Sequence, residues 1–168
     1  VKLLMGQALL NSAQYKEAVA VFEGISADSS ESRYFDQAFY WTAEAYFRAK
    51  DFPSAIKYYT EVVERFPSSK FYVYSRFSRA WSYYELQNYD NAVEEFRSLK
   101  EDFETHPLSI ESTYKIGQCL YEEKKYEEAT QVLQDFVLKH SLHPKVPAAY
   151  YLLGDSYYNL GEYSLALE

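Results

Sequence analysis

Apolar residues fall three and four positions apart along the whole chain, and the arrangement returns every 37 residues. Within one such unit, residues 36–72, a first apolar run covers 39–47 and a second covers 55–66, with a short break at 49–51 between them. This spacing is typical of amphipathic helices, and Pro53 suits the first turn of the second helix. Each unit is therefore predicted to form a helical hairpin.

Small residues occupy two fixed positions in these hairpins. They allow two helices to cross closely, because a larger side chain of one helix then fits against the other. A period between about 20 and 50 residues indicates stacked repeats, in which each unit contacts only its neighbours. We predict structural roles for Gly6, Ala43, Ala80, Gly117 and Gly154 on the first helices, and for Ala18, Ala55, Ala92, Ala129 and Ala166 on the second helices.

The repeat predicts an all-α solenoid made of about five such hairpins. We expect one array whose units cover about 1–35, 36–72, 73–109, 110–146 and 147–168. The first and last units are truncated in this alignment. On that ground we expect the chain to be a fragment of a longer protein.

The stretch Tyr-Tyr-Leu-Leu-Gly-Asp-Ser-Tyr-Tyr at 150–158, followed by Gly161-Glu162-Tyr163 and Ala166, resembles the signature of the tetratricopeptide repeat family. The resemblance covers the whole chain, although the usual period of the family is about 34 residues. The additional residues follow the second helix of each unit. The resemblance implies a right-handed α-α superhelix whose first helices line a concave groove, and a function in protein binding.

The longer links between hairpins are similar to those of tetratricopeptide arrays in bacterial envelope proteins. One link reads Arg-Phe-Pro-Ser-Ser at 65–69, and His-Pro pairs at 106–107 and 143–144 precede the next two hairpins. Proteins with similar links include the lipoprotein that assembles outer-membrane β-barrels and the coordinator of the Tol–Pal system. This resemblance implies the periplasm or the cell envelope in preference to the cytoplasm.

The face of the first helices that would line the groove is rich in aromatic residues. Spacings of four and three place two aromatic columns and one mostly polar column on this face. Tyrosine and tryptophan suit protein recognition because they bury a large area and keep a polar tip. The candidate partner-binding residues are Tyr40, Phe47, Phe77, Trp81, Tyr84, Tyr114, Gln118, Tyr121, Tyr151 and Tyr158.

These aromatic residues have a second interpretation, because tyrosines at such positions in the family also pack between neighbouring repeats. Trp81 stands where the other units carry Gln, Glu or Asp, so the repeat does not require it. Arg79 lies in a mostly apolar column and is expected to pair or to reach solvent. A clamp for a terminal carboxylate is not expected, because the groove columns lack lysine and contain Glu44 and Asp155.

Charge and candidate chemistry exclude several classes of function. The chain has 25 acidic and 17 basic residues, a formal net charge of −8, which disfavours nucleic acid as a partner. Cys119 is the single cysteine, so no internal disulfide forms. His140 and His143 lack a third ligand at suitable spacing. We expect no metal, no cofactor, no catalytic residue and no membrane span in this segment.

The sequence thus predicts a non-catalytic scaffold that binds an extended or helical segment of a partner protein in an aromatic concave groove, with a role in bacterial envelope assembly. One alternative is a structural array that works by self-association. A weaker alternative is binding of a glycan or of peptidoglycan, since Tyr and Trp rings also stack on sugars.

Overall fold

The computed structural model describes residues 1–167, which contain helices and no strand. This all-helical structure of consecutively packed helices confirms the predicted fold class. The elements are α1 (Lys2–Asn11), α2 (Tyr15–Ser26), the 3-10 helix η1 (Ser29–Tyr34), α3 (Phe35–Arg48), α4 (Phe52–Arg65), α5 (Tyr72–Glu85), α6 (Tyr89–Asp102), α7 (Pro107–Glu122), α8 (Tyr126–Lys139), α9 (Val146–Asn159) and α10 (Tyr163–Ala166).

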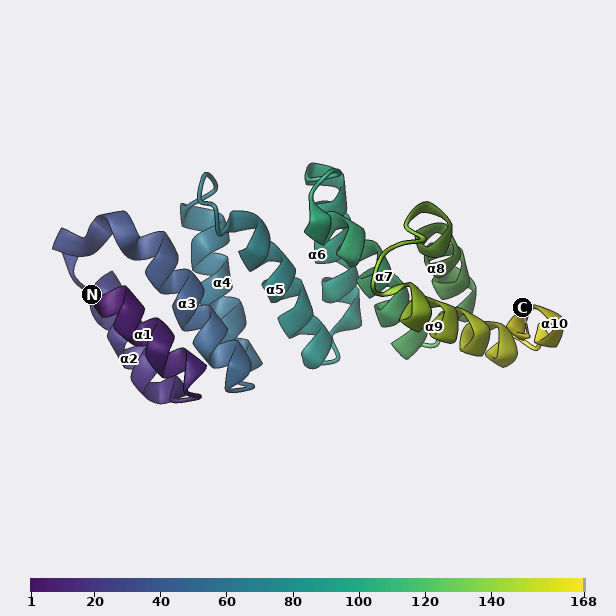
Figure 1. The fold of residues 1–168 in the computed structure, drawn as a ribbon, viewed down its shortest axis with the longest axis horizontal. Coiled ribbons are helices and arrows are strands. Elements are labelled where there is room, and N and C mark those ends of the chain that lie inside the picture. The colour runs from purple at the N-terminus through teal and green to yellow at the C-terminus, as the bar shows by residue number, and fades with distance from the viewer. Residues whose placement is uncertain (168) are drawn as a thin grey trace. The chain divides into compact units, whose positions relative to one another are not determined.

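The chain forms two compact units, Val1–Leu86 with α1 to α5 and Gln87–Glu168 with α6 to α10. In the first unit every helix packs against the next along the chain, and α1 with α2 and α3 with α4 make two hairpins (Figure 1). The second unit repeats this succession from α6 to α10. Each unit is therefore a stack in which neighbours in sequence are neighbours in space.

Both units bury the apolar faces that the helical spacing predicts. One buried cluster of the first unit joins α1, α2 and α3 and contains Leu10, Ala18, Val19, Phe22, Ile25, Ala38 and Ala45. In the second unit the buried apolar residues include Phe96, Leu99, Ile116, Leu120, Leu133 and Phe136. Burial of these side chains is the main stabilising contribution to each stack.

In the hairpins α1–α2, α3–α4 and α7–α8, small residues lie where the two helices pack together. Ala18, Ala43, Ala55, Ala80, Ala92 and Ala129 are fully buried. A Cβ atom added to Gly117 would lie 2.6 Å from Cγ of Leu133, and one added to Gly6 would collide with the ring of Phe22. Gly154 differs, because a Cβ atom there would meet only the carbonyl oxygen of Ala166, at 3.5 Å.

The turns inside the hairpins share one conformation. Ala13, Lys50, Gln87, Lys124 and Gly161, spaced 37 residues apart, all have positive φ angles between 58° and 79°. After α7, the amide of Lys124 donates to the carbonyl of Tyr121 and the amide of Lys125 donates to that of Leu120. These two bonds form a Schellman motif, whose left-handed position favours glycine. Only the last of the five turns has glycine there.

Replacement of Lys124 by glycine is expected to stabilise the protein by about 0.5–1 kcal/mol, because a non-glycine residue in the left-handed region costs about 1–2 kcal/mol and glycine recovers most of that. Glu128, exposed in the first turns of α8, provides the control. Its replacement by glycine in a helix should destabilise by about 1 kcal/mol. Urea denaturation of both variants measures the difference, and two changes of the same sign would contradict the account.

The α4–α5, α6–α7 and α8–α9 links also share one geometry, whereas η1 occupies the link between α2 and α3. In the first unit, the amide of Ser69 donates to the carbonyl of Phe66, and the amide of Tyr72 donates to that of Ser69. The Ser69 hydroxyl accepts a hydrogen bond from the amide of Phe71, at 3.0 Å. His106 and His143 hold the same register in the second unit and make the same two backbone bonds, three residues back and three residues on. The additional residues of each repeat are thus ordered by hydrogen bonds.

Candidate protein-binding surface

The ten candidate residues lie on first helices, as the spacing predicts. We call the side of α3, α5, α7 and α9 that carries them the first-helix surface, and we describe it separately for the two units. The first unit holds Tyr40, Phe47, Phe77, Trp81 and Tyr84. The second unit holds Tyr114, Gln118, Tyr121, Tyr151 and Tyr158.

Trp81 connects two first helices in the first unit. Its ring lies edge-on to Phe47 of α3, with centroids 5.8 Å apart, and edge-on to Phe77 of α5 at 6.2 Å. The indole Nε1 donates to Oε1 of Glu85 at 2.9 Å. Phe77 is buried, and Trp81 and Phe47 are partly buried. Much of this aromatic group therefore packs between repeats, and Trp81 is only partly exposed.

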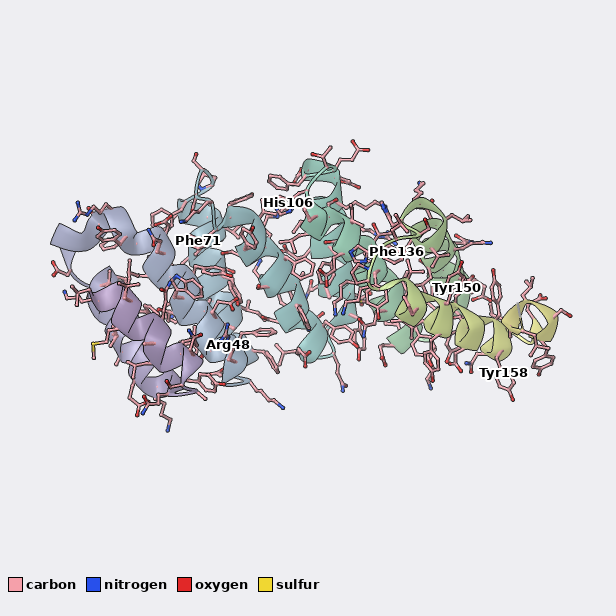
Figure 2. All side chains as sticks on the ribbon, in the orientation of Figure 1. Arg48, Phe71, His106, Phe136, Tyr150 and Tyr158 are labelled. Carbon is pink, nitrogen blue, oxygen red and sulfur yellow. The ribbon has the colours of Figure 1, made fainter. Side chains whose placement is uncertain are left out.

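Tyr40 lies in a second aromatic group at the beginning of α5. Its ring stacks on Phe71 with a centroid distance of 4.6 Å, and Figure 2 labels Phe71 at the link that leads into α5. The nearby Glu44 accepts a hydrogen bond from the hydroxyl of Tyr59 at 2.6 Å. Burial, and then the Glu44 carboxylate, raise the pKa values of Tyr40 and Tyr59. Glu44 is thus engaged by the hairpin itself.

Tyr74 is a surface residue that the sequence interpretation missed. Its side chain is 47 % exposed, three residues before Phe77 on α5, and it lies close enough to raise the pKa of Tyr40. The sequence signal that could have identified Tyr74 is its position three residues before Phe77, which belongs to one of the groove columns. The first-helix surface of the first unit therefore presents an exposed Tyr74 beside the packed ring of Tyr40.

Tyr121 of α7 reaches the next first helix. Its hydroxyl donates to Oδ2 of Asp155 on α9 at 2.5 Å, and Nδ2 of Asn159 donates to the same oxygen at 3.1 Å. The hydrogen bond to Asp155, followed by burial, raises the pKa of Tyr121 to about 12. Carboxylates of the polar column thus accept hydrogen bonds from tyrosines, between repeats at Asp155 and within one hairpin at Glu44.

Two lysines flank Tyr114, which is itself buried. The ammonium nitrogens of Lys115 and Lys145 each lie 6.0 Å from the centre of its ring. Nζ of Lys115 also donates to Oε1 of Gln118 at 3.2 Å. A cation at this distance is attracted by the ring. Gln118 is therefore held in place, and positive charge lies beside the first-helix surface where the sequence columns contain none.

Tyr151 and Tyr158 of α9 are the most exposed members of the set, at 71 % and 62 %. Figure 2 shows Tyr150 and Tyr158 projecting from this helix. A hollow of about 470 Å³ beside Gly154 is lined by these three tyrosines and by Asp155, among others. Tyr114 and Tyr121, at the same register, are largely covered. Exposed aromatic area is therefore concentrated on α9 in the second unit.

Arg79 and Cys119, which the sequence also singled out, are held by the packing of the helices. Nη1 of Arg79 donates to the hydroxyl of Thr60 on α4 at 3.1 Å, so the charge reaches a neighbouring second helix. Cys119 is fully buried, and burial raises the pKa of its thiol to about 12.

Within residues 1–167, His, Cys, Asp and Glu side chains form no group of three that could hold a metal ion. None of the helices in that range combines the length and hydropathy of a membrane span.

Hairpins with small crossing residues, left-handed turns and an aromatic first-helix surface define a tetratricopeptide repeat array. A tetratricopeptide repeat family model matches residues 3–70. The model described as "YfiO: Outer membrane lipoprotein" matches residues 77–165, which is more than half of the chain. The chain belongs to this outer membrane lipoprotein family.

Solved structures confirm the fold. The chain is similar to tetratricopeptide-like repeats of a putative kinesin light chain from Podosopora anserina, with TM-score 0.76, 18% identity, and coverage of 99% of this chain and 88% of that one. It is similar to MamA from Desulfovibrio magneticus RS-1, with TM-score 0.81, 13% identity, and coverage of 99% and 87%. It also matches half of the apo form of RapI, with TM-score 0.85, 20% identity and coverage of 99% of this chain. No curated protein sequence matches the chain.

Proposed function

We propose that this array is a non-catalytic scaffold that binds an extended or helical segment of a partner protein on its first-helix surface, in the bacterial cell envelope. The observation that carries the proposal is the exposed ring of Tyr74 on α5, at 47 %, together with the partly exposed rings of Trp81 and Tyr84 on the same helix. Exposed tyrosines of this kind are enriched at protein interfaces, where the ring is buried and the hydroxyl finds a partner.

The covered residues refine the proposed site. Phe77 and Tyr114 are buried, and Tyr121 is tied to Asp155, so they shape the surface and contribute little area to a ligand. Trp81 offers only part of its ring. In the first unit the proposed contact residues are therefore Tyr74 with the exposed parts of Trp81 and Tyr84. In the second unit they are Tyr151 and Tyr158.

The envelope location is supported by the family to which the chain belongs, whose model carries the description of an outer membrane lipoprotein. The link geometry is compatible with it, since the additional residues that resemble envelope arrays form ordered, hydrogen-bonded links in both units. A scaffold in that compartment would hold partner proteins during assembly of the envelope.

Site-specific photo-crosslinking in the full-length protein tests this function. A benzophenone amino acid placed at Tyr74 or Tyr151 should yield one discrete crosslinked partner in envelope fractions of the bacterium. The same probe at Glu64 of α4 or Leu138 of α8, which are exposed on second helices, is the matched control. Crosslinks of equal yield from both pairs of positions, or from the second helices alone, would contradict binding on the first-helix surface.

A further inference from the structure

All three histidines of the chain lie in the two links of the second unit. His106 precedes α7, and His140 and His143 lie between α8 and α9 (Figure 2 labels His106). The corresponding link of the first unit has Phe66 in the place of His140 and Ser69 in the place of His143. Histidine is the side chain whose ordinary pKa falls between pH 5 and 8. Sensitivity to mild acid is therefore concentrated at two structurally equivalent places.

Two of these histidines make the hydrogen bond that orders their link. Nδ1 of His106 accepts from the amide of Leu108, and Nδ1 of His143 accepts from the amide of Lys145, both at 3.2 Å. An imidazole nitrogen accepts only while it carries no proton. The Ser69 hydroxyl, which makes the same bond in the first unit, keeps its acceptor at any pH in this range.

The third histidine packs beside the second link. The rings of His140 and His143 lie 5.6 and 5.3 Å from the ring of Phe136, centre to centre. The charged groups that act on His140 are Asp135, which favours its protonation, and His143, Lys139 and Lys100, which oppose it. Asp135 is itself paired with Lys139 at 2.8 Å.

Charged residues also lie close in sequence to His106 and His143. Lys145 follows His143 at the beginning of α9, and Lys139 precedes it at the end of α8. His106 follows Lys100 and Asp102 of the last turns of α6 and Glu104 of the link. Each of these two histidines stands at the N-terminal end of a helix, where the helix dipole disfavours an added positive charge.

We propose that the α6–α7 and α8–α9 links form a pH-sensitive element, which is ordered at neutral pH and is loosened when the histidines are protonated. Protonation converts Nδ1 of His106 and His143 from acceptor to donor, so that it opposes the amide it binds. It also adds positive charge near His140, where His143, Lys139 and Lys100 already oppose protonation. The link of the first unit contains no titrating residue at these positions and keeps its order.

The sign of the dependence follows from His140. Burial, followed by the neighbouring His143, lowers the pKa of its folded form. A group whose pKa is lowered by folding stabilises the protein above its unfolded pKa, near 6.5 for histidine, and this contribution is lost as the pH falls through the folded value. Acidification thus acts in the direction that the hydrogen bonds predict. It would loosen α7 and α9, which carry Tyr121, Tyr151 and Tyr158.

Amide hydrogen exchange of the full chain at pH 7.5 and pH 5.5 tests this inference, with each rate divided by the intrinsic rate at that pH. Protection of the first turns of α7 and α9 should fall about fivefold or more, as expected for the loss of one hydrogen bond. Protection of the first turn of α5 should change less than twofold. Carboxylates, with ordinary pKa values near 4, stay charged at pH 5.5.

Variants that copy the link of the first unit separate this element from general acid effects. The combined changes His106→Ser, His140→Phe and His143→Ser should keep protection at pH 7.5 and remove its fall at pH 5.5 in both helices. His143→Ser alone should reduce the fall in α9 and leave the fall in α7. A fall of equal size in α5 of the wild type, or a variant that keeps the wild-type dependence, would overturn the inference. The readout needs no partner, so its failure would leave the proposed binding function standing.

Discussion

Replacement of Phe136 by alanine is expected to lower the free energy of unfolding by about 3–5 kcal/mol, the largest effect we predict for a single substitution. Phe136 is fully buried in the second unit. Its ring contacts Tyr114 of α7, with centroids 5.8 Å apart, and both histidines of the α8–α9 link. Alanine would leave a cavity at the point where two hairpins and their link meet.

Leu138, two residues further along α8, provides the control. It is 74 % exposed, and its replacement by alanine should change stability by less than about 0.5 kcal/mol. Chemical denaturation followed by circular dichroism measures both variants. A Phe136→Ala variant that unfolds at the same denaturant concentration as Leu138→Ala would show that the packing of α7, α8 and their links is not as described.

Replacement of Gly117 by alanine is expected to destabilise the protein by about 1–3 kcal/mol, although alanine is the better helix former. The added Cβ would lie 2.6 Å from Cγ of Leu133, which is fully buried and cannot move away without disturbing its own neighbours. The helices α7 and α8 would have to separate. Melting temperature and urea denaturation both report the change.

Gly24 of α2 is the control for Gly117. A Cβ atom added there meets nothing within 4 Å. Gly24→Ala should therefore be neutral or stabilise by up to about 1 kcal/mol. Loss of stability in both variants to the same extent would contradict the explanation by close helix crossing.

Much of the fold could be predicted because the 37-residue repeat keeps the same positions in register along the whole chain. The apolar spacing and the small columns predicted the hairpins. The left-handed turns were not predicted, because Ala13, Lys50 and Lys124 adopt a conformation that favours glycine. The bonds within the links could not be predicted, because they depend on side chains whose role varies. At one repeat position, serine and histidine side chains both accept a hydrogen bond from the backbone amide two residues further on. The spacing of these residues in the sequence does not predict this bond.

The candidate surface was predicted less completely, for a physical reason. Helical spacing places residues on one face but does not show which of them the next hairpin covers. Phe77 and Tyr114 are buried whereas Tyr40 is only partly buried, although all three share one column. The carboxylates of Glu44 and Asp155 likewise bind tyrosines from other helices, and these pairings arise only in three dimensions.

Calorimetric titration with the crosslinked segment of the partner, prepared as a peptide, tests the central claim most directly. The wild-type chain should bind the peptide, and Tyr74→Ala or Tyr151→Ala should raise the Kd at least tenfold, which corresponds to about 1.4 kcal/mol for an exposed aromatic contact residue. Glu64→Ala, on a second helix, should leave the Kd unchanged. An unchanged Kd in both tyrosine variants, or an equal loss in the Glu64 variant, would contradict binding on the first-helix surface.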